Sequence, residues 1–229
     1  TGLELIPAMM LLGGLSLAYS LYGGLKAVAL TDVIQVVLLI FGGLFVTYKG
    51  LDLLSEGNGL FEGFMILQSE FPEKFDAILS YAPKEVDPEA YANYIKLPGI
   101  WVLIGGMWIA HFYYWGTNQY ITQRALGGKS LDDAQNGLMF AGFLKIFMPI
   151  VVVLPGLIAV ALEANGTINL AGDRSNAYPS MLNLLPEGIK GLTFAALVAA
   201  IVSSLASLSN SVSTIFTMDI YRKDQDIND

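Results

Sequence analysis

A run of aromatic and hydrogen-bonding side chains lies within one apolar stretch of the sequence. Residues 110–119 read Ala-His-Phe-Tyr-Tyr-Trp-Gly-Thr-Asn-Gln, and His111, Tyr114 and Trp115 are the members we single out. Aromatic faces beside hydrogen-bonding groups suit a sugar, which has apolar C–H faces and many hydroxyls. A belt of aromatic residues at a membrane interface is the alternative interpretation. Gly116 interrupts the run, which favours a broken helix of the kind that forms binding sites in transporters.

A single lysine lies well inside another apolar stretch, in Phe-Leu-Lys145-Ile-Phe. Ionisable groups within membrane spans are costly and are functional candidates by default. Lys145 is therefore a candidate for contact with a polar ligand. The alternatives are a structural ion pair or a long side chain that reaches back to the interface.

Small residues recur at helical spacing near the C-terminus. Ala200, Ser203 and Ser204 stand at i, i+3 and i+4, so they share one helix face. Serine hydroxyls and backbone carbonyls are neutral oxygens of the type that binds Na⁺, a hard cation. Close packing of helices through small residues would produce the same pattern.

Asp32 is a candidate of a different kind, because it opens an apolar stretch. With Thr31 and Gln35 it resembles a helix N-cap with a capping box. Placed near the cytoplasmic mouth of a transport path, its carboxylate would instead attract a departing cation.

The composition places these residues in a membrane protein. Hydrophobic residues make up 54% and charged residues 14% of the chain, whereas soluble domains carry about 25% charged residues. The chain has no cysteine and one histidine, which excludes thiolate and multi-histidine metal sites. A net charge of −8 argues against nucleic acid as a partner. Because no pairing of nucleophile and base is apparent, we expect no enzyme.

Five apolar stretches are long enough to cross a bilayer as helices, which requires about 20 residues each. The first two are joined by a tight turn that we place around Lys26–Thr31, and the second and third by a long acidic connection that we expect to contain short amphipathic helices. The predicted spans are Leu5–Leu30, Val33–Leu54, Ile100–Tyr120, Leu138–Leu162 and Leu192–Phe216.

The basic residues give the predicted spans an orientation. Lys26, Arg124, Lys129, Arg222 and Lys223 fall on one side of a five-span topology, which the positive-inside rule makes cytoplasmic. Five spans place the termini on opposite sides of the bilayer, and residue 1 is not methionine. We therefore expect an internal piece of a larger protein of the cell inner (plasma) membrane that crosses the bilayer several times.

Several ordered motifs resemble the sodium:solute symporter family. They are Tyr-Ser-Leu-Tyr-Gly-Gly-Leu-Lys-Ala at 19–27, Thr-Asp-Val-Ile-Gln at 31–35 and Ile-Val-Ser-Ser-Leu-Ala-Ser at 201–207. The sequence Tyr-Tyr-Trp-Gly-Thr-Asn-Gln-Tyr-Ile-Thr-Gln-Arg at 113–124 is similar to the sugar-transporting branch of that family. The resemblance covers nearly the whole chain.

The resemblance implies an all-α polytopic membrane protein, here part of the leucine-transporter fold with its two inverted five-helix repeats. On that map the chain contains the end of the first repeat (1–54), an extracytoplasmic loop (55–97), the start of the second repeat (98–219) and a cytoplasmic tail (220–229).

The resemblance also assigns roles to residues. Ala200, Ser203 and Ser204 match ligands of the family's Na⁺ site, and Asp32 matches an acidic residue near the inner Na⁺ route. Tyr114 matches an aromatic that stacks under the sugar, with Trp115 beside it, and Lys145 matches a sugar hydroxyl contact. His111 stands where galactose-transporting members have an asparagine, which leaves the identity of the sugar open.

The expected function is symport of Na⁺ and a sugar, a hexose or related polyol, by alternating access. Two alternatives remain open: a symporter for another small solute, and the symporter-like membrane domain of a sensor kinase. The expected partners are the sugar, Na⁺ and the lipid bilayer.

Overall fold

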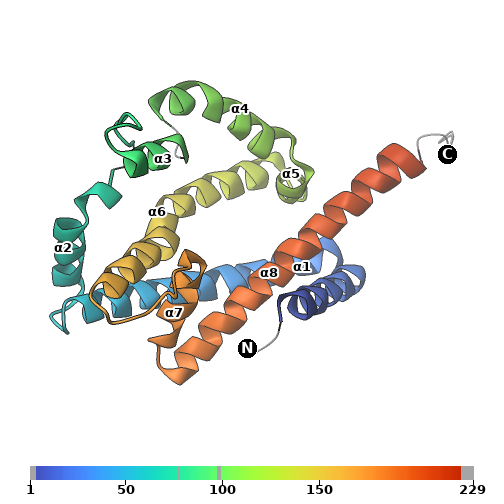
Figure 1. Cartoon of the computed structure of the whole chain (residues 1–229). Coiled ribbons are helices and arrows are strands. Elements are labelled where there is room, and N and C mark those ends of the chain that lie inside the picture. The colour runs from blue at the N-terminus through green and yellow to red at the C-terminus, as the bar shows by residue number, and fades with distance from the viewer. Residues whose placement is uncertain (1–3, 77, 97–98, 223–229) are drawn as a thin grey trace.

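The computed structural model describes residues 4–76, 78–96 and 99–222, and the regular secondary structure within these ranges is helical (Figure 1). Residues 223–229, which include Lys223 and most of the predicted tail, lie outside the described residues, as do 1–3, 77 and 97–98. The α-helices are α1 (Leu5–Leu54), α2 (Leu60–Glu70), α3 (Pro88–Lys96), α4 (Met107–Phe112), α5 (Gln119–Leu126), α6 (Leu131–Ala164), α7 (Ala177–Asn183) and α8 (Glu187–Ile215).

Four helical segments in the described residues are long and apolar enough to cross a membrane. Each is 20 residues or longer, which is about the length that a helix needs to cross the hydrocarbon core of a bilayer. They correspond to four of the five predicted spans in length and composition, although the boundaries differ. The segments are Leu5–Gly24, Lys26–Leu54, Leu131–Ala164 and Glu187–Tyr221.

The turn between the first two spans lies earlier than predicted. Helix α1 is kinked at Gly24, which has φ 58° and ψ −175°, a conformation that glycine adopts readily because it has no Cβ. The prediction of a turn around Lys26–Thr31 is therefore wrong, since those residues are helical. The Tyr19 hydroxyl donates to the Ala27 carbonyl at 3.2 Å and contacts the Thr31 hydroxyl, which ties the two sides of the kink together.

The third predicted span is helical but is not one continuous α-helix. Residues 100–117 are helical, with π-helical turns at Val102–Gly106 and Tyr113–Thr117 on either side of α4. The segment ends at Asn118 rather than at Tyr120, because Asn118 is extended and its side chain caps α5 by accepting from the Tyr120 amide. A break near Gly116 was predicted, and π-helical turns often occur at functional sites.

The long connection between α1 and α4 contains part of the predicted amphipathic structure. Helix α2 is one such short helix and buries Leu67. Directly after it the described residues form only a short 3-10 turn at Pro72–Lys74, where the proline restricts the backbone. Asp87 caps α3 through hydrogen bonds from the amides of Glu89 and Ala90.

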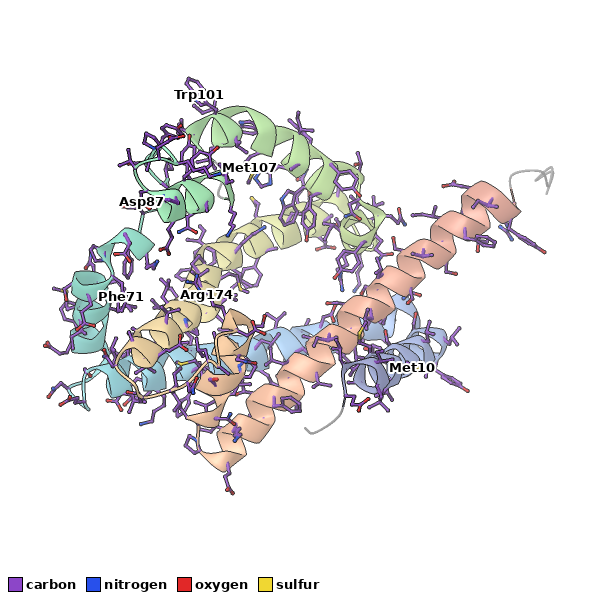
Figure 2. The ribbon with its side chains drawn as sticks, viewed as in Figure 1. Met10, Phe71, Asp87, Trp101, Met107 and Arg174 are labelled. Atoms are coloured by element: carbon purple, nitrogen blue, oxygen red, sulfur yellow. The ribbon has the colours of Figure 1, made fainter. Side chains whose placement is uncertain are left out.

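The core of the described structure lies where α1, α2, α6 and α7 meet. Val46, Ile158, Leu162 and Met181 are almost completely buried there. Helix α8 crosses α1, while α4 lies away from both and is joined to them through α5 and α6 (Figure 1). Many apolar side chains point outward along the helices (Figure 2), an arrangement suited to hydrocarbon surroundings.

We expect Gly63→Ala to destabilise the protein, because α2 lies directly on the backbone of α1 at this glycine. A Cβ at Gly63 would meet the Leu51 carbonyl well inside contact distance, so α2 would have to move. Overpacking of this kind costs about 1–3 kcal/mol. The melting temperature of the detergent-solubilised full-length protein would measure the effect. Gly142→Ala is the control, because a Cβ there meets nothing within 4 Å, and equal melting temperatures for the two variants would contradict the prediction.

Candidate functional site

The four residues predicted to serve a cation surround one cavity. Asp32 from α1 and Ala200, Ser203 and Ser204 from α8 line a cavity of about 390 Å³. Three α1 residues and Arg124 of α5 complete its wall. Asp32 and the α8 residues are far apart in the sequence, so only the crossing of α1 and α8 brings them together.

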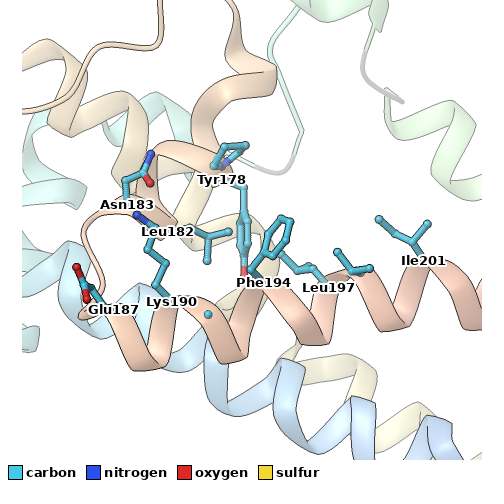
Figure 3. Close-up of a pocket in the computed structure, with 11 residues that line it drawn as sticks. Tyr178, Leu182, Asn183, Glu187, Lys190, Phe194, Leu197 and Ile201 are labelled. Carbon is cyan, nitrogen blue, oxygen red and sulfur yellow. The ribbon is translucent and has the colours of Figure 1, made fainter. Parts of the chain in front are cut away.

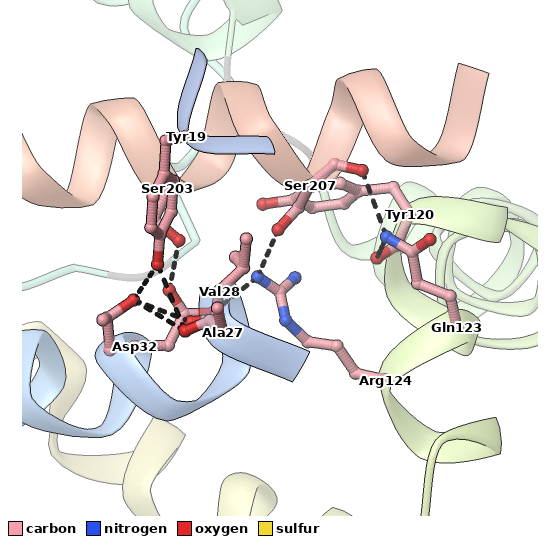
Figure 4. Close-up of polar contacts among 10 residues, drawn as sticks. Tyr19, Ala27, Val28, Asp32, Tyr120, Gln123, Arg124, Ser203 and Ser207 are labelled. Carbon is pink, nitrogen blue, oxygen red and sulfur yellow. Dashed lines mark hydrogen bonds and ion pairs between the residues drawn. The ribbon is translucent and has the colours of Figure 1, made fainter. Parts of the chain in front are cut away.

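Asp32 is fixed by two partners on other helices (Figure 4). The Ser203 hydroxyl donates to Oδ1 of Asp32, and Nη2 of Arg124 donates to Oδ2 at 2.7 Å. Ser203 is only 3% exposed. The N-cap interpretation of Asp32 is wrong, because Asp32 lies inside α1, where the amides that follow it bond to carbonyls of the preceding helical turn. Thr31 likewise bonds back to the Ala27 and Val28 carbonyls.

Arg124 and Ser207 belong to this network, although sequence reasoning did not identify either as a site residue. Nη2 of Arg124 also donates to the Ser207 hydroxyl at 2.8 Å, and Nε2 of Gln123 donates to the Ser207 carbonyl at 3.1 Å. Ser207 stands four residues after Ser203 on the same small-residue face. That spacing was the available signal for Ser207; the pairing of Arg124 with Asp32 depends on contacts 92 residues apart.

The electrostatics of the cavity are set by one ion pair and several neutral oxygens. Burial of the guanidinium lowers the pKa of Arg124, but the pairing with Asp32 and the neighbouring Tyr120 side chain outweigh this effect and leave the pKa above its ordinary value. Arg124 is therefore charged at physiological pH. No group of three or more His, Cys, Asp or Glu side chains suited to a metal ion occurs among the described residues. The serine hydroxyls and the single carboxylate that line this cavity provide the oxygen ligands that a hard cation prefers.

Trp115 is the centre of the residues predicted to bind a sugar. Its ring lies edge-on to that of Tyr114, with centroids 5.1 Å apart and an interplanar angle of 85°. Nζ of Lys145, from α6, lies 4.4 Å from the centroid of the Trp115 ring. His111 and Trp115 also line one cavity of about 320 Å³. The structure thus brings each of the other three predicted residues close to Trp115, and the ammonium of Lys145 has a cation–π partner.

A third cavity has Trp115 and Arg124 in its wall. It has a volume of about 400 Å³ and is lined by Trp115, Arg124 and residues of α5 and α6. Arg124 therefore borders both this cavity and the one that contains Asp32. Helix α5, which carries Arg124, begins directly after the π-helical turn that carries Tyr114 and Trp115.

A larger cavity lies at the other end of α8 and contains none of the predicted site residues (Figure 3). It has a volume of about 710 Å³ and is mostly apolar, with Tyr178, Leu182 and Phe194 in its wall and Glu187 and Lys190 at its edge. Size alone does not make it the functional site, because its wall is mostly apolar and its charged residues lie at the edge.

Comparison with known proteins identifies the family. Long apolar helices that hold ionisable residues on their inner faces are typical of membrane transport proteins. A sequence profile of the sodium:solute symporter family matches residues 1–226. The chain therefore belongs to the sodium:solute symporter family.

Three similar proteins have names that describe cotransport or symport. A sodium/glucose cotransporter of Vibrio parahaemolyticus is 44% identical over 97% of this chain. A sodium/myo-inositol cotransporter of Homo sapiens is 34% identical over 96% of the chain, and an uncharacterized symporter of Escherichia coli is 35% identical over 94%. The chain spans 42% of the length of the first relative and 34% of the length of the other two.

We expect Lys145→Ala to weaken sugar binding in the full-length protein while leaving Na⁺ affinity nearly unchanged. Lys145 lies against Trp115 and is not among the residues that line the Asp32 cavity. Loss of a hydrogen bond from a charged group costs about 1.5–3 kcal/mol, or roughly tenfold to hundredfold in affinity. Binding of labelled sugar and the Na⁺ dependence of uptake would measure the two effects. An equal loss of both affinities would indicate a structural lysine instead.

Proposed function

We propose that this chain contributes the Na⁺ site and part of the sugar site of a Na⁺-coupled sugar symporter that works by alternating access. Na⁺ would bind beside Ser203 and Ser204, with Asp32 near its route to the cytoplasm. A hexose or a related polyol would bind against Tyr114 and Trp115, with polar contacts from His111 and Lys145.

The convergence of Asp32, Ala200, Ser203 and Ser204 on one cavity carries this proposal. Small-residue packing alone would explain the spacing along α8, but it would not require a carboxylate from α1 at the same point. The hydrogen bond from Ser203 to Asp32 links the carboxylate directly to a proposed ligand. These groups supply negative charge and neutral oxygens to an entering cation.

We also propose the leucine-transporter fold for the chain, with its apolar helices crossing the inner (plasma) membrane several times. The segment of residues 100–117, with its π-helical turns, would be the third of five spans in chain order. One positive charge moving inward across 100 mV releases about 2.3 kcal/mol. That energy alone supports roughly fiftyfold accumulation of the sugar, since about 1.4 kcal/mol corresponds to tenfold.

The proposed substrate class is supported by the relatives and by the aromatic residues around Trp115. Cotransporters named for glucose and for myo-inositol each match nearly the whole chain. Both compounds are ring polyols with apolar C–H faces, which suit the faces of aromatic side chains.

Uptake by the full-length protein in transporter-deficient cells tests the proposal. Tritiated glucose, galactose and myo-inositol would each be supplied in Na⁺ buffer and in choline buffer. We expect at least one to accumulate only with Na⁺. Equal uptake in the two buffers, or no uptake of any of the three, would count against Na⁺-coupled sugar transport.

His111→Asn is expected to change the ranking of these sugars. An imidazole can donate or accept one hydrogen bond at each nitrogen, whereas an amide is smaller and offers two donors and an acceptor oxygen. The variant should shift preference toward galactose in competition assays. An unchanged ranking would place His111 outside the pocket. Phe112→Leu is the control, because Phe112 lies next to His111 and lines the same cavity of about 320 Å³. This variant changes the shape of the cavity without changing its hydrogen-bonding groups.

A further inference from the structure

Helix α5 joins the residues proposed to bind sugar to those proposed to bind Na⁺. It begins after Asn118, where the backbone is extended with φ −74° and ψ 111°. On one side of this break are Tyr114 and Trp115. On the other side, Arg124 reaches Asp32 and Ser207 (Figure 4). A displacement of α5 would therefore affect both groups of residues.

Among the described residues, the hydrogen bonds between α5 and α8 converge on Ser207. Gln123 and Arg124 are both bonded to Ser207, one helical turn from Ser203. The guanidinium and the carboxylate are 33% and 23% exposed. Both charged groups are thus only partly buried by the described residues.

Arg124 and a bound Na⁺ would both interact with the carboxylate of Asp32. The carboxylate of Asp32 accepts from Ser203 on Oδ1 and from Arg124 on Oδ2. A Na⁺ ion at Ser203 and Ser204 would lie in the cavity that both Asp32 and Arg124 line. Its positive charge would compete with the guanidinium for the carboxylate and would repel Arg124.

We propose that Arg124 is a positioning residue that couples Na⁺ binding to sugar binding. Entry of Na⁺ weakens the pairing of Arg124 with Asp32, and α5 responds by moving the adjoining turn that carries Tyr114 and Trp115. The inference rests on the proposed function, because it assumes that both ligands bind this protein. Beyond that function, the inference names Arg124 as the residue through which the Na⁺ site affects the sugar site.

Equilibrium binding to the purified full-length protein tests this role. The probe is whichever of tritiated glucose, galactose and myo-inositol shows the highest Na⁺-dependent uptake. The coupling factor is the ratio of the sugar Kd in choline to the sugar Kd in Na⁺. Coupling between two sites typically amounts to about 5–150-fold. We expect Arg124→Gln to lower the coupling factor about fivefold or more, because loss of the pair with Asp32 brings the sugar Kd in choline close to the Kd that the unmodified protein has in Na⁺.

Two further variants separate coupling from folding. Arg124→Lys keeps the charge but lacks the planar fork of the guanidinium, and we expect it to fold and to show an intermediate coupling factor. Lys129→Gln removes an exposed positive charge close to α5 and should leave the coupling factor unchanged. Melting temperatures of all variants would be measured alongside.

The outcomes distinguish this inference from the proposed function. An absence of any Na⁺ effect on sugar binding in the unmodified protein would overturn both. A normal coupling factor in Arg124→Gln would overturn the role of Arg124 alone. So would a lower melting temperature and weaker sugar binding in choline with the coupling factor unchanged, since that pattern shows a purely structural arginine. No recovery of coupling by lysine relative to glutamine would also contradict the proposal.

Discussion

Replacing Ser204 with alanine is expected to raise the Na⁺ concentration for half-maximal sugar uptake about tenfold. The Ser204 side chain is exposed and lines the cavity that contains Asp32. Its removal would delete one oxygen ligand, and a tenfold change in affinity corresponds to about 1.4 kcal/mol. The measurement is uptake by the full-length protein over a range of Na⁺ concentrations.

The small size of alanine makes this variant informative. Alanine preserves the small-residue face of α8, so the amount of protein in the membrane should be unchanged. Ser213→Ala is the matched control, because Ser213 lies on the same helix, is exposed, and does not line that cavity. Unchanged Na⁺ dependence in Ser204→Ala, or a collapse in expression, would instead favour a packing role for the α8 serines.

Replacing Tyr114 with alanine is expected to weaken sugar binding about tenfold or more, and Tyr114→Phe is expected to have a smaller effect. In the proposed site the aromatic ring would supply the stacking face, and its edge-on contact also supports Trp115. Truncation of a well-placed tyrosine in a binding site commonly costs about 2 kcal/mol or more. Phenylalanine keeps the ring and loses only the hydroxyl. Sugar binding at saturating Na⁺ would measure the effect.

Tyr113→Ala provides the control for this prediction. Tyr113 is the same residue type in the same π-helical turn, but its side chain is 63% exposed and has no recorded aromatic partner among the described residues. Equal losses in Tyr113→Ala and Tyr114→Ala would indicate that the turn as a whole was disturbed. Normal binding by Tyr114→Ala would remove Tyr114 from the sugar site.

The spans could be predicted from the sequence because long apolar runs have few alternatives to a membrane helix. The predicted span Leu138–Leu162 is helical through Pro149 and Pro155, and the helix extends further at both ends, from Leu131 to Ala164. The turn after the first span was misplaced because the region from Lys26 to Thr31 has turn-like polarity, whereas the bend depends on the backbone conformation of Gly24. Polarity was therefore a weaker signal here than the conformational freedom of one glycine.

The third span shows where helical periodicity is insufficient. Gly116 predicted an interruption, but the position of the break at Asn118 follows from its side-chain cap on α5. Periodicity also cannot distinguish an α-helix from the π-helical turns on either side of α4. Those turns determine which way Tyr114 and Trp115 point.

In the candidate site, features that depend on local helical spacing could be predicted from the sequence, whereas contacts between distant helices could not. Helical spacing alone placed Ala200, Ser203 and Ser204 on one face. The sequence around Asp32 pointed to an N-cap, because its true partners, Ser203 and Arg124, come from helices that meet α1 only after folding. The contact of Lys145 with Trp115 has the same origin, since it joins α6 to the π-helical turn. The ligand roles of these residues stay predictions.

The central claim is that Na⁺ and sugar move together. The most direct test is to use a sugar gradient to drive the movement of Na⁺. The full-length protein in proteoliposomes would be given equal Na⁺ on both sides, no membrane potential and an inward gradient of the sugar selected by the uptake panel. We predict that radioactive Na⁺ enters with the sugar and accumulates above its external concentration, and that Ser204→Ala reduces this movement. Sugar entry that leaves the Na⁺ distribution unchanged would contradict the account.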